Sequence, residues 1–232
     1  MGLLDSGATF QRLMDMVMSG LIFETCLVYL DDIVIFSRTW EEHLPRLEAV
    51  LKRILDTGLK LKPSKCKLLQ RKVIFLGHVI TGDGVATDPS KTEEINRWPV
   101  PRSTKDVRSF LGLCGYYRRF INQYAEIAFP MTSLLKKGVK FRWSETCQEA
   151  FEKLKAALTS PPILAMPRDE GTFFLDTDAS DHSVGAVLSQ MQDGQERVIA
   201  YAAKVLQPSQ VKYCAYRREL LGTIIFVRHF RN

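Results

Sequence analysis

The 232-residue sequence predicts an α+β fold, in which amphipathic helices alternate with short groups of antiparallel strands. Residues 25–36 and 73–80 are rich in Val, Ile, Leu, Phe and Tyr, a composition typical of strands. Three further segments, 172–178, 184–190 and 197–203, follow one another with short connections, which favours an antiparallel sheet. Much of the remaining chain places its apolar residues at helical spacing.

The first part of the chain alternates helical and extended patterns. Residues 9–21 place apolar side chains at helical spacing. Residues 25–36 form an apolar run interrupted only by two aspartates, which predicts a β-hairpin with those aspartates at its tip. Residues 41–58 predict an amphipathic helix that ends at a glycine. Because proline is tolerated best in the first helical turn, Pro45 predicts that this helix begins after Glu41 or bends.

The middle of the chain contains a basic segment, a strand pair and two capped helices. Residues 59–67 predict a basic extended segment, and residues 73–84 predict a strand pair closed by a turn. The Trp-Pro-Val-Pro stretch at 98–101 is a stiff break. Ser103 and Ser144 each precede a helical pattern, where their hydroxyls can cap a helix.

The distribution of charge along the chain is compatible with a protein that binds nucleic acid. The net charge is +6 and the pI about 9.1, which permits a nucleic-acid partner. Residues 1–37 hold one Arg and five acidic residues, whereas residues 38–72 hold ten basic and four acidic residues. A polymerase needs such a pairing, because carboxylates bind cations and cations bind phosphates. On charge alone, a solvated helix face and a lysine-rich loop remain the commoner explanation.

Cysteine use and hydropathy predict the compartment. The five cysteines are odd in number and include no C-x-x-C pair, which favours reduced thiols over a disulfide scaffold or a zinc site. No segment is apolar enough to span a membrane, and the start has no signal-peptide pattern. We therefore expect an intracellular, cytoplasmic protein without a membrane partner.

Asp31 and Asp32 lie between two apolar strands, which is an unusual place for two acids. Aspartate is common in turns because it bonds to nearby backbone, but such turns more often carry Asp-Gly or Asn-Gly. Adjacent carboxylates at a hairpin tip also suit Mg²⁺, which prefers oxygen ligands. Two such ions about 3.5–4 Å apart can activate a primer 3′-hydroxyl and stabilise the departing pyrophosphate.

Several motifs occur in an order that resembles a known family. Tyr29-Leu30-Asp31-Asp32 resembles the catalytic turn of reverse transcriptases. The other motifs are Gly2-Leu3-Leu4 with Ala8-Thr9-Phe10-Gln11, Gly58-Leu59-Lys60-Leu61 with Lys65-Cys66, Phe75-Leu76-Gly77-His78, residues 108–113 with 116–120, residues 143–158, and Thr177-Asp178-Ala179-Ser180 with 185–190. Together they resemble the palm, primer grip, thumb, connection and ribonuclease H segments in the Pol polyprotein of gypsy-class long-terminal-repeat retrotransposons.

The resemblance implies roles for particular residues. Asp31 and Asp32 would be catalytic ligands of Mg²⁺ or Mn²⁺, and Lys65 would assist pyrophosphate departure, with a merely solvated or phosphate-contacting lysine as the alternative. The residues that would contact an RNA or DNA primer–template are Gly2, Gln11, Tyr29, Phe75, Leu76, Gly77 and Arg118. For Phe75–Gly77 a buried strand is the alternative, and both can hold at once. For the two tyrosines before Arg118, the alternative is one ring in the core and one in solvent.

The resemblance also implies a second site and several missing parts. Asp178 and Glu219 would be ribonuclease H carboxylates beside one cation. The family's polymerase site uses a third carboxylate and its ribonuclease H site two more, and none of these lies in the present 232 residues. Asp5 and Gly7 stand where the family usually has Asn and Pro. We therefore expect weak metal binding and no polymerase activity from this chain alone. In the full enzyme, its partners would be deoxynucleotide triphosphate and the absent palm and fingers.

The predicted organisation follows the order of the motifs. It comprises a partial polymerase palm at 1–85, a helical thumb at 86–138, a connection at 139–170, and a truncated ribonuclease H-like β-β-β-α domain at 171–232, whose helix is expected at 213–230. The implied function is RNA-directed DNA polymerase with a ribonuclease H-like segment, in a cytoplasmic virus-like particle of the parent element or in the nucleus. The alternative is a non-catalytic nucleic-acid-binding or degenerate retroelement remnant.

Overall fold

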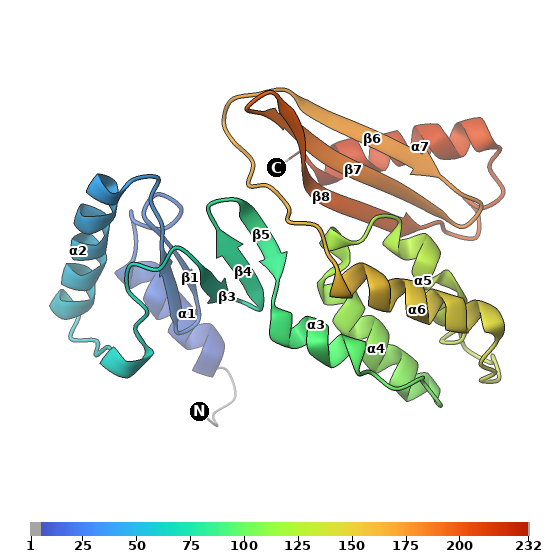
Figure 1. The fold of residues 1–232 in the computed structure, drawn as a ribbon, viewed down its shortest axis with the longest axis horizontal. Coiled ribbons are helices and arrows are strands. Elements are labelled where there is room, and N and C mark those ends of the chain that lie inside the picture. The colour runs from blue at the N-terminus through green and yellow to red at the C-terminus, as the bar shows by residue number, and fades with distance from the viewer. Residues whose placement is uncertain (1–5, 232) are drawn as a thin grey trace. The chain divides into compact units, whose positions relative to one another are not determined.

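The computed structural model describes residues 6–231, which divide into two units between Gln70 and Arg71 (Figure 1). The predicted α+β fold is confirmed, because both units contain helices and antiparallel strands. Gly2, one of the predicted nucleic-acid contacts, lies outside the described residues. Between residues 6 and 231, no helix is long and apolar enough to cross a membrane. The cysteines all lie in this range and form no disulfide.

The smaller unit, up to Gln70, packs helices against the β1–β2 hairpin. Its elements in chain order are α1 (Ser6–Val17), β1 (Cys26–Tyr29), β2 (Asp32–Ile35), α2 (Trp40–Asp56) and a 3-10 turn at Pro63–Lys65. Their shared core contains Met14, Val17, Met18, Cys26, Val50 and Ile54. The predicted hairpin is confirmed, and so is the helix before it, which begins and ends three to four residues earlier than the pattern predicts.

Helix α2 begins at Trp40, so the later start that Pro45 suggested is excluded and the proline lies inside the helix. The Thr39 hydroxyl accepts a hydrogen bond from Glu42 N (3.3 Å) and caps the first turn. Acidic residues in this turn also interact favourably with the helix dipole. At the other end, Gly58 adopts a φ of +72°, the left-handed conformation expected of a glycine just beyond a helix.

The larger unit begins with an antiparallel meander in the order β3–β4–β5. Its elements are β3 (Val73–Phe75), β4 (His78–Thr81), β5 (Gly84–Thr87), α3 (Pro89–Asn96), α4 (Thr104–Tyr116), a 3-10 turn at Arg118–Phe120, α5 (Tyr124–Ser133), α6 (Glu145–Thr159), β6 (Phe173–Ala179), β7 (Ser183–Gln192), β8 (Gln195–Val205) and α7 (Ala215–His229). The predicted caps Ser103 and Ser144 are confirmed, since each hydroxyl accepts a bond from a backbone N–H. Helix α3 was not predicted, although Asp88 caps it and Pro89 is its first residue.

Residues 71–85, which the sequence prediction placed with the palm, fold with the larger unit. Val85 N donates to Leu164 O (2.8 Å) and Leu164 N donates to Val85 O (2.9 Å), so β5 is bound to the connecting segment. The approach is close at Gly84, where a Cβ would lie 2.1 Å from Leu164 O. Only glycine fits there. The main division of the chain therefore falls after residue 70 and not after residue 85.

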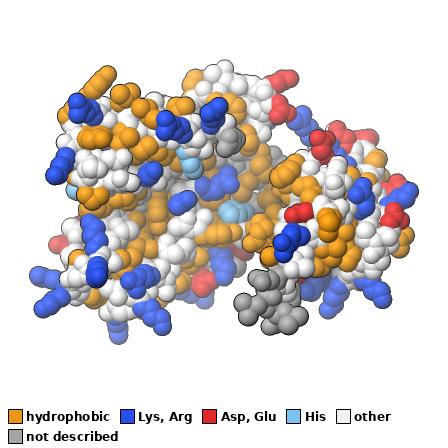
Figure 2. Space-filling model, turned by 180° about the vertical axis from the view of Figure 1, so that it is seen from behind, with side chains coloured by type: hydrophobic (Ala, Val, Ile, Leu, Met, Phe, Trp, Pro, Cys, Tyr) orange, Lys and Arg blue, Asp and Glu red, His pale blue; other side chains and the backbone are white. Residues whose placement is uncertain are grey.

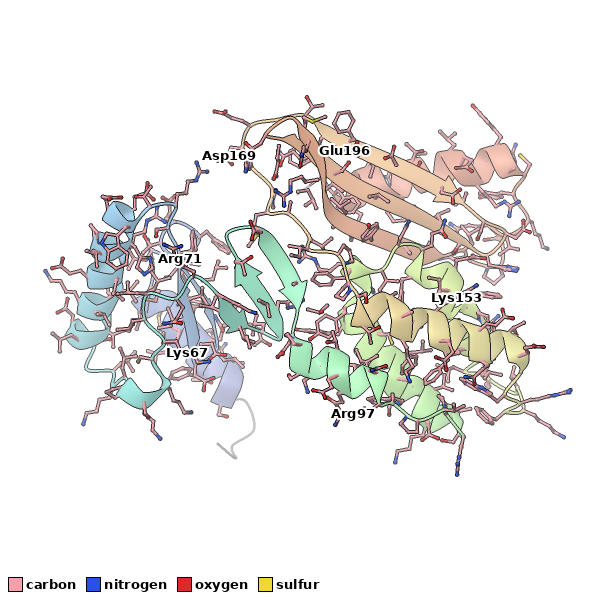
Figure 3. The ribbon with its side chains drawn as sticks, viewed as in Figure 1. Lys67, Arg71, Arg97, Lys153, Asp169 and Glu196 are labelled. Carbon is pink, nitrogen blue, oxygen red and sulfur yellow. The ribbon has the colours of Figure 1, made fainter. Side chains whose placement is uncertain are left out.

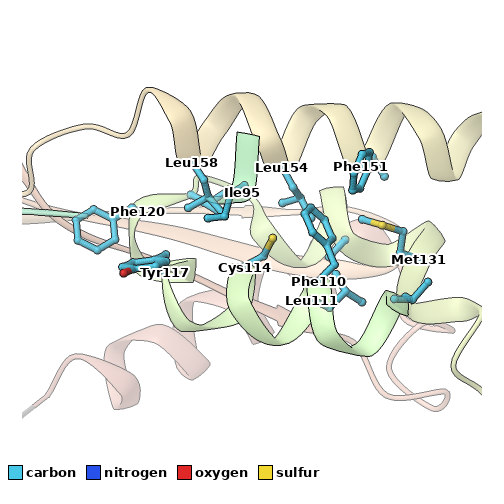
Figure 4. Packing of buried hydrophobic residues seen from close by; sticks show 14 of the residues in the cluster. Ile95, Phe110, Leu111, Cys114, Tyr117, Phe120, Met131, Phe151, Leu154 and Leu158 are labelled. Carbon is cyan, nitrogen blue, oxygen red and sulfur yellow. The ribbon is translucent and has the colours of Figure 1, made fainter. Parts of the chain in front are cut away.

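The core of the larger unit joins helices α3 to α6 (Figure 4). The buried side chains that Figure 4 labels are Ile95, Phe110, Leu111, Cys114, Tyr117, Phe120, Met131, Phe151, Leu154 and Leu158. The rings of Phe110 and Phe151 lie 4.6 Å apart between centroids. Burial raises the pKa of the Cys114 thiol to about 12, so this cysteine stays protonated and packs as an apolar residue.

Strands β6, β7 and β8 form an antiparallel sheet with α7 on one face and α5 on the other. Val184 and Phe226 are buried on the α7 side, whereas Tyr201 packs against the helical core. The outer side of α7 is apolar and exposed, and its residues are Tyr216, Leu220, Ile224 and Val227. Figure 2 shows hydrophobic side chains on the visible surface of each unit.

Candidate active site and nucleic-acid interface

The β1–β2 hairpin presents Asp31 and Asp32 to solvent. Tyr29 pairs with Asp32, so Leu30 and Asp31 form a two-residue turn. Both carboxylates are exposed, and no ion pair joins either of them to another residue in the range 6–231. Leu30 has a φ of +52°, a left-handed conformation that is costly for a residue with a branched side chain. Such strain persists where the surroundings hold it in place.

Gln11 holds this turn from helix α1. The Leu30 N–H donates a hydrogen bond to Gln11 Oε1, and Gln11 Nε2 donates to Asp15 Oδ1 (2.8 Å). Gln11 was predicted to contact nucleic acid, but its amide oxygen and nitrogen both bond within the protein. Its structural role is therefore to position the aspartate turn. Sequence spacing could not reveal this contact, because it joins residues 19 positions apart.

The donor set of the turn fits a divalent cation. Two exposed carboxylates offer the hard oxygen ligands that Mg²⁺ and Mn²⁺ prefer. Tyr29, whose ring is also exposed, lies beside them on β1. Lys65 ends the 3-10 turn in the same unit with an exposed side chain, and no described contact joins it to either aspartate. The structure thus brings Tyr29, Asp31 and Asp32 together and leaves Lys65 apart.

The β3–β4 hairpin turns at Leu76 and Gly77, within the motif that resembles the primer grip. Both residues have positive φ, +47° and +66°, as a type I′ turn requires. Phe75 is half-buried, and the Leu76 side chain is 37 % exposed. The predicted buried strand is found only in part, since Phe75 is half-buried while Leu76 and the preceding Ile74 are exposed.

Residues at the end of helix α4 fix the carbonyl groups of this turn. Tyr116 Oη donates to Leu76 O, and Tyr117 Oη donates to Gly77 O (2.7 Å). The His78 ring lies among these tyrosines, and its Nδ1 is 2.8 Å from Leu76 O. Tyr117 is 1 % exposed and Tyr116 is 52 % exposed, which confirms the expected division of the pair between core and solvent.

Each unit exposes basic side chains. In the smaller unit, every residue from 60 to 70 is exposed, and this stretch carries lysines without an acidic neighbour: Lys60, Lys62, Lys65 and Lys67. Figure 3 labels Lys67 on the loop that follows the 3-10 turn. In the larger unit, Arg118 is exposed directly after the tyrosine pair. These cations can contact a phosphate backbone.

Asp178 lies on strand β6 and Glu219 on helix α7, and each carboxylate is exposed. The Thr177 hydroxyl lies 3.2 Å from the Thr223 hydroxyl of α7, so Thr177 faces that helix. Neighbouring residues of a strand point to opposite faces, which turns Asp178 away from the helix that carries Glu219. Asp178 Oδ2 instead accepts a hydrogen bond from Gln123 Nε2 (3.0 Å). Among residues 6–231, no described contact joins Asp178 to Glu219.

Hydrogen bonds also join helix α5 to the loop after β6. Glu126 accepts hydrogen bonds from the hydroxyls of Ser180 and Ser183, the latter at 2.7 Å. Arg218 donates to Ser180 O (2.9 Å) and to the Asp181 carboxylate, and this bond lowers the pKa of Asp181. Within residues 6–231, no group of three or more His, Cys, Asp or Glu is arranged to hold a metal. The sequence patterns predicted neither the Glu126 contacts nor the Gln123 contact.

Two regions of the chain match known protein families. Residues 1–80 match the family described as reverse transcriptase (RNA-dependent DNA polymerase). Residues 143–232 match the RNase H-like domain found in reverse transcriptase. Residues 81–142, which hold strand β5 and helices α3 to α5, fall outside both matches.

Curated relatives and solved structures match over nearly the whole chain. The Pol polyprotein of transposon 297 from Drosophila melanogaster is 44% identical over 100% of this chain and 22% of its own length, and that of transposon gypsy is 35% identical over 100% and 23%. The chain thus spans about a fifth of the length of these relatives.

Solved structures are similar to the chain as well. A foamy viral protease-reverse transcriptase structure in complex with double-stranded DNA has a TM-score of 0.85 and 27% identity, covering 99% of this chain and 40% of that one. Another, in complex with an RNA/DNA hybrid, has a TM-score of 0.81 and 27% identity, with 98% and 31% covered.

These matches agree with the motif order and the hairpin geometry. The catalytic-turn motif lies on an exposed hairpin, and the primer-grip motif lies on a second hairpin bound to the helix that carries the thumb motif. The chain therefore belongs to the reverse transcriptase and ribonuclease H region of the Pol polyproteins of gypsy-class retrotransposons.

Proposed function

We propose that this chain supplies the catalytic turn and part of the primer–template surface of an RNA-directed DNA polymerase. The observation that carries the proposal is the exposed Asp31–Asp32 pair on a turn whose backbone is fixed by Gln11. A fixed turn presents carboxylate oxygens in one geometry, and electrostatic stabilisation of phosphoryl transfer requires such preorganisation. In the whole enzyme, the substrate would be a deoxynucleotide triphosphate.

The role of the protein residues follows from their positions. When bound, Mg²⁺ or Mn²⁺ would supply Lewis-acid stabilisation of the reacting phosphate. Asp31 and Asp32 would hold the cation, because their carboxylates are exposed and accept no ion pair from residues 6–231. Gln11 would keep the turn in its strained conformation, and Lys65 would add positive charge near the phosphates.

Duplex binding is the second part of the proposal. The exposed lysines between residues 60 and 67 can neutralise phosphates, and the Leu76–Gly77 turn can contact the primer. The similar foamy viral structures contain double-stranded DNA or an RNA/DNA hybrid, which supports a duplex as the ligand of this chain. The parent element would carry out this reaction in a cytoplasmic virus-like particle or in the nucleus.

A salt titration tests duplex binding. A fluorescently labelled DNA primer annealed to an RNA template is titrated with the chain at increasing salt, and the affinity is followed by fluorescence anisotropy. Because several phosphate contacts release counterions, we expect the affinity to fall at least about tenfold between 50 and 200 mM salt. An affinity that is undetectable or independent of salt would contradict duplex binding.

Primer extension tests the catalytic part. The 232 residues hold two of the three polymerase carboxylates that the family resemblance implies, so the chain alone is expected to extend a primer no better than its Asp31→Asn/Asp32→Asn variant. A chimera in which the chain replaces the matching segment of the transposon 297 polyprotein is expected to extend the primer. The same double substitution should abolish that activity. An active double variant would refute the role of the turn.

A non-catalytic nucleic-acid-binding role is the second candidate. It is favoured by Asp178, which bonds to Gln123 and faces away from the helix of Glu219. A chain with this role would bind the duplex in the salt titration, while the chimera would extend no primer. An active chimera would exclude it.

A further inference from the structure

The Leu76–Gly77 turn is held through its two carbonyl oxygens. Leu76 O accepts from Tyr116 Oη and lies 2.8 Å from His78 Nδ1. Gly77 O accepts from Tyr117 Oη (2.7 Å) and from the Asp88 N–H (3.3 Å). A carbonyl oxygen has two acceptor positions, so each oxygen is fully used inside the protein.

Tyr117 is a rigid donor in this arrangement. Its ring is buried in the helical core beside Phe120, as Figure 4 shows, and the two ring centroids lie 6.2 Å apart. Burial is the main cause that raises the pKa of Tyr117 to about 12, so its hydroxyl remains a donor at neutral pH. The phenol is therefore fixed in place and always protonated when it bonds to Gly77 O.

Packing alone does not explain a tyrosine at this position. A phenylalanine would fill the same space in the core without bringing a polar group into it. The hydroxyl instead bonds to a backbone carbonyl 40 residues away in the sequence. A Cβ on Gly77 would lie 3.2 Å from this hydroxyl, so the glycine is fitted to the tyrosine as well.

We infer that Tyr117, with Tyr116, is a positioning residue that fixes the Leu76–Gly77 turn so that it can hold the 3′ end of a primer. The inference rests on the proposed function. Because the carbonyl groups bond toward helix α4, the Leu76 side chain remains free at the tip of the turn. A turn fixed in this way moves with the thumb helix, which makes the pair one unit for gripping the primer end.

Hydrogen exchange tests the link between hydroxyl and turn without any nucleic acid. In the full chain, Tyr117→Phe should speed amide exchange across residues 74–79 about fivefold, the effect expected from one lost hydrogen bond. Tyr124→Phe is the matched control, because Tyr124 is partly buried in the same unit and its hydroxyl donates to Leu111 O (3.2 Å). It should leave exchange in residues 74–79 unchanged. Equal exchange in wild type and Tyr117→Phe would overturn the inference.

End recognition tests the role of the turn. One probe is a DNA primer with a recessed 3′ end on an RNA template, and the other is the same duplex closed by a loop at each end. The wild-type chain should prefer the recessed end about fivefold, as expected for one additional contact. Tyr117→Phe should lower this preference to nearly one and leave the affinity for the closed duplex within about twofold. A merely structural defect would weaken both probes equally.

The outcomes separate the two proposals. If the wild-type chain binds neither probe, the proposed duplex binding fails, and the exchange measurement still decides whether Tyr117 fixes the turn. If the wild type prefers the recessed end and Tyr117→Phe keeps that preference, the positioning role is overturned while duplex binding stands. If Tyr117→Phe loses the preference and Tyr124→Phe keeps it, both proposals are supported.

Discussion

The β1–β2 and β3–β4 hairpins have similar turns that are held in opposite ways. Each has a two-residue turn whose first residue is a leucine in the left-handed conformation, Leu30 at +52° and Leu76 at +47°. The first turn is held through a backbone N–H that bonds to Gln11, and its carboxylates remain open. The second is held through both carbonyl groups by donors around helix α4. A turn that binds cations must expose its side chains, whereas a turn that grips a strand end needs a fixed backbone.

Leucine is an unfavourable choice at both positions. A positive φ costs a residue with a Cβ roughly 1–2 kcal/mol. In the second turn, where both Leu76 and Gly77 have positive φ, Asn-Gly is the sequence that the type I′ geometry favours. Leu76 already precedes a glycine, so a single change would complete that preferred sequence. A strained leucine in each turn indicates that the conformation of the turn and the leucine side chain are needed for function, at a cost in local stability.

Of the substitutions considered, Gly77→Ala in the β3–β4 turn should lower the free energy of unfolding most. Gly77→Ala introduces left-handed strain and a Cβ 3.2 Å from the Tyr117 hydroxyl, so we expect a loss of about 2 kcal/mol in the free energy of unfolding. Gly138→Ala is the control, since Gly138 has a φ of +83° in the same unit and no atom within 4 Å of the added Cβ. It should cost about 1 kcal/mol. Urea unfolding measures both, and equal losses would contradict the Tyr117 contact.

Removing the Gln11 acceptor tests the anchor of the other turn. Gln11→Leu leaves the Leu30 N–H without its partner, which should cost the smaller unit about 1–2 kcal/mol. Gln11→Glu keeps an acceptor oxygen for the Leu30 N–H but brings a second carboxylate beside Asp15, so it should protect that amide while retaining only part of the stability. Hydrogen exchange of the Leu30 amide distinguishes the two variants. Fast exchange in both, or in neither, would show that the Gln11 side chain does not hold the turn.

Relieving the strain at Leu76 should change stability and binding in opposite directions. Leu76→Asn completes an Asn-Gly turn, and because the leucine side chain is partly exposed, we expect a gain of about 0.5–1 kcal/mol. If the leucine side chain contacts the primer, the same variant should bind a recessed 3′ end less tightly than wild type. Thermal unfolding and fluorescence anisotropy measure the two effects. A variant that is less stable, or that binds more tightly, would contradict the interpretation of the strain.

His78 should make the second turn sensitive to acid. Burial lowers the pKa of His78 below its usual 6.5, so the folded state binds fewer protons than the unfolded state. Its contribution to stability is therefore complete above pH 6.5 and is lost as the pH falls below that value. His78→Asn, which offers an amide donor to Leu76 O and does not titrate, should flatten the decline between pH 7.5 and 5.5. An unchanged decline in urea unfolding would show that other groups cause it.

Sequence patterns predicted the elements well where apolar periodicity determines them. The β1–β2 hairpin and the helices capped by Ser103 and Ser144 follow directly from apolar spacing and cap chemistry. The short helix α3 escaped prediction because its eight residues have little amphipathic pattern, although Asp88-Pro89 is a helix-start signal.

The candidate site was only partly predictable, because its supporting contacts are long-range. The sequence indicated Asp31 and Asp32 through their position between apolar strands. It could not show that Gln11 bonds to the turn, or that Tyr117 bonds to Gly77, since side-chain contacts 19 and 40 residues apart leave no periodic pattern. The association of residues 71–85 with the larger unit was missed for the same reason, because β5 is bound to a segment about 80 residues further along.

Binding of Mn²⁺ to the full chain tests the central claim most directly. Paramagnetic broadening of amide signals detects even weak cation binding and reports where it occurs. We predict selective broadening from Tyr29 to Ile33 and loss of the broadening in Asp31→Asn/Asp32→Asn. Broadening that centres elsewhere, or that persists in the double variant, would contradict the assignment of the β1–β2 turn as the metal-binding turn of a reverse transcriptase.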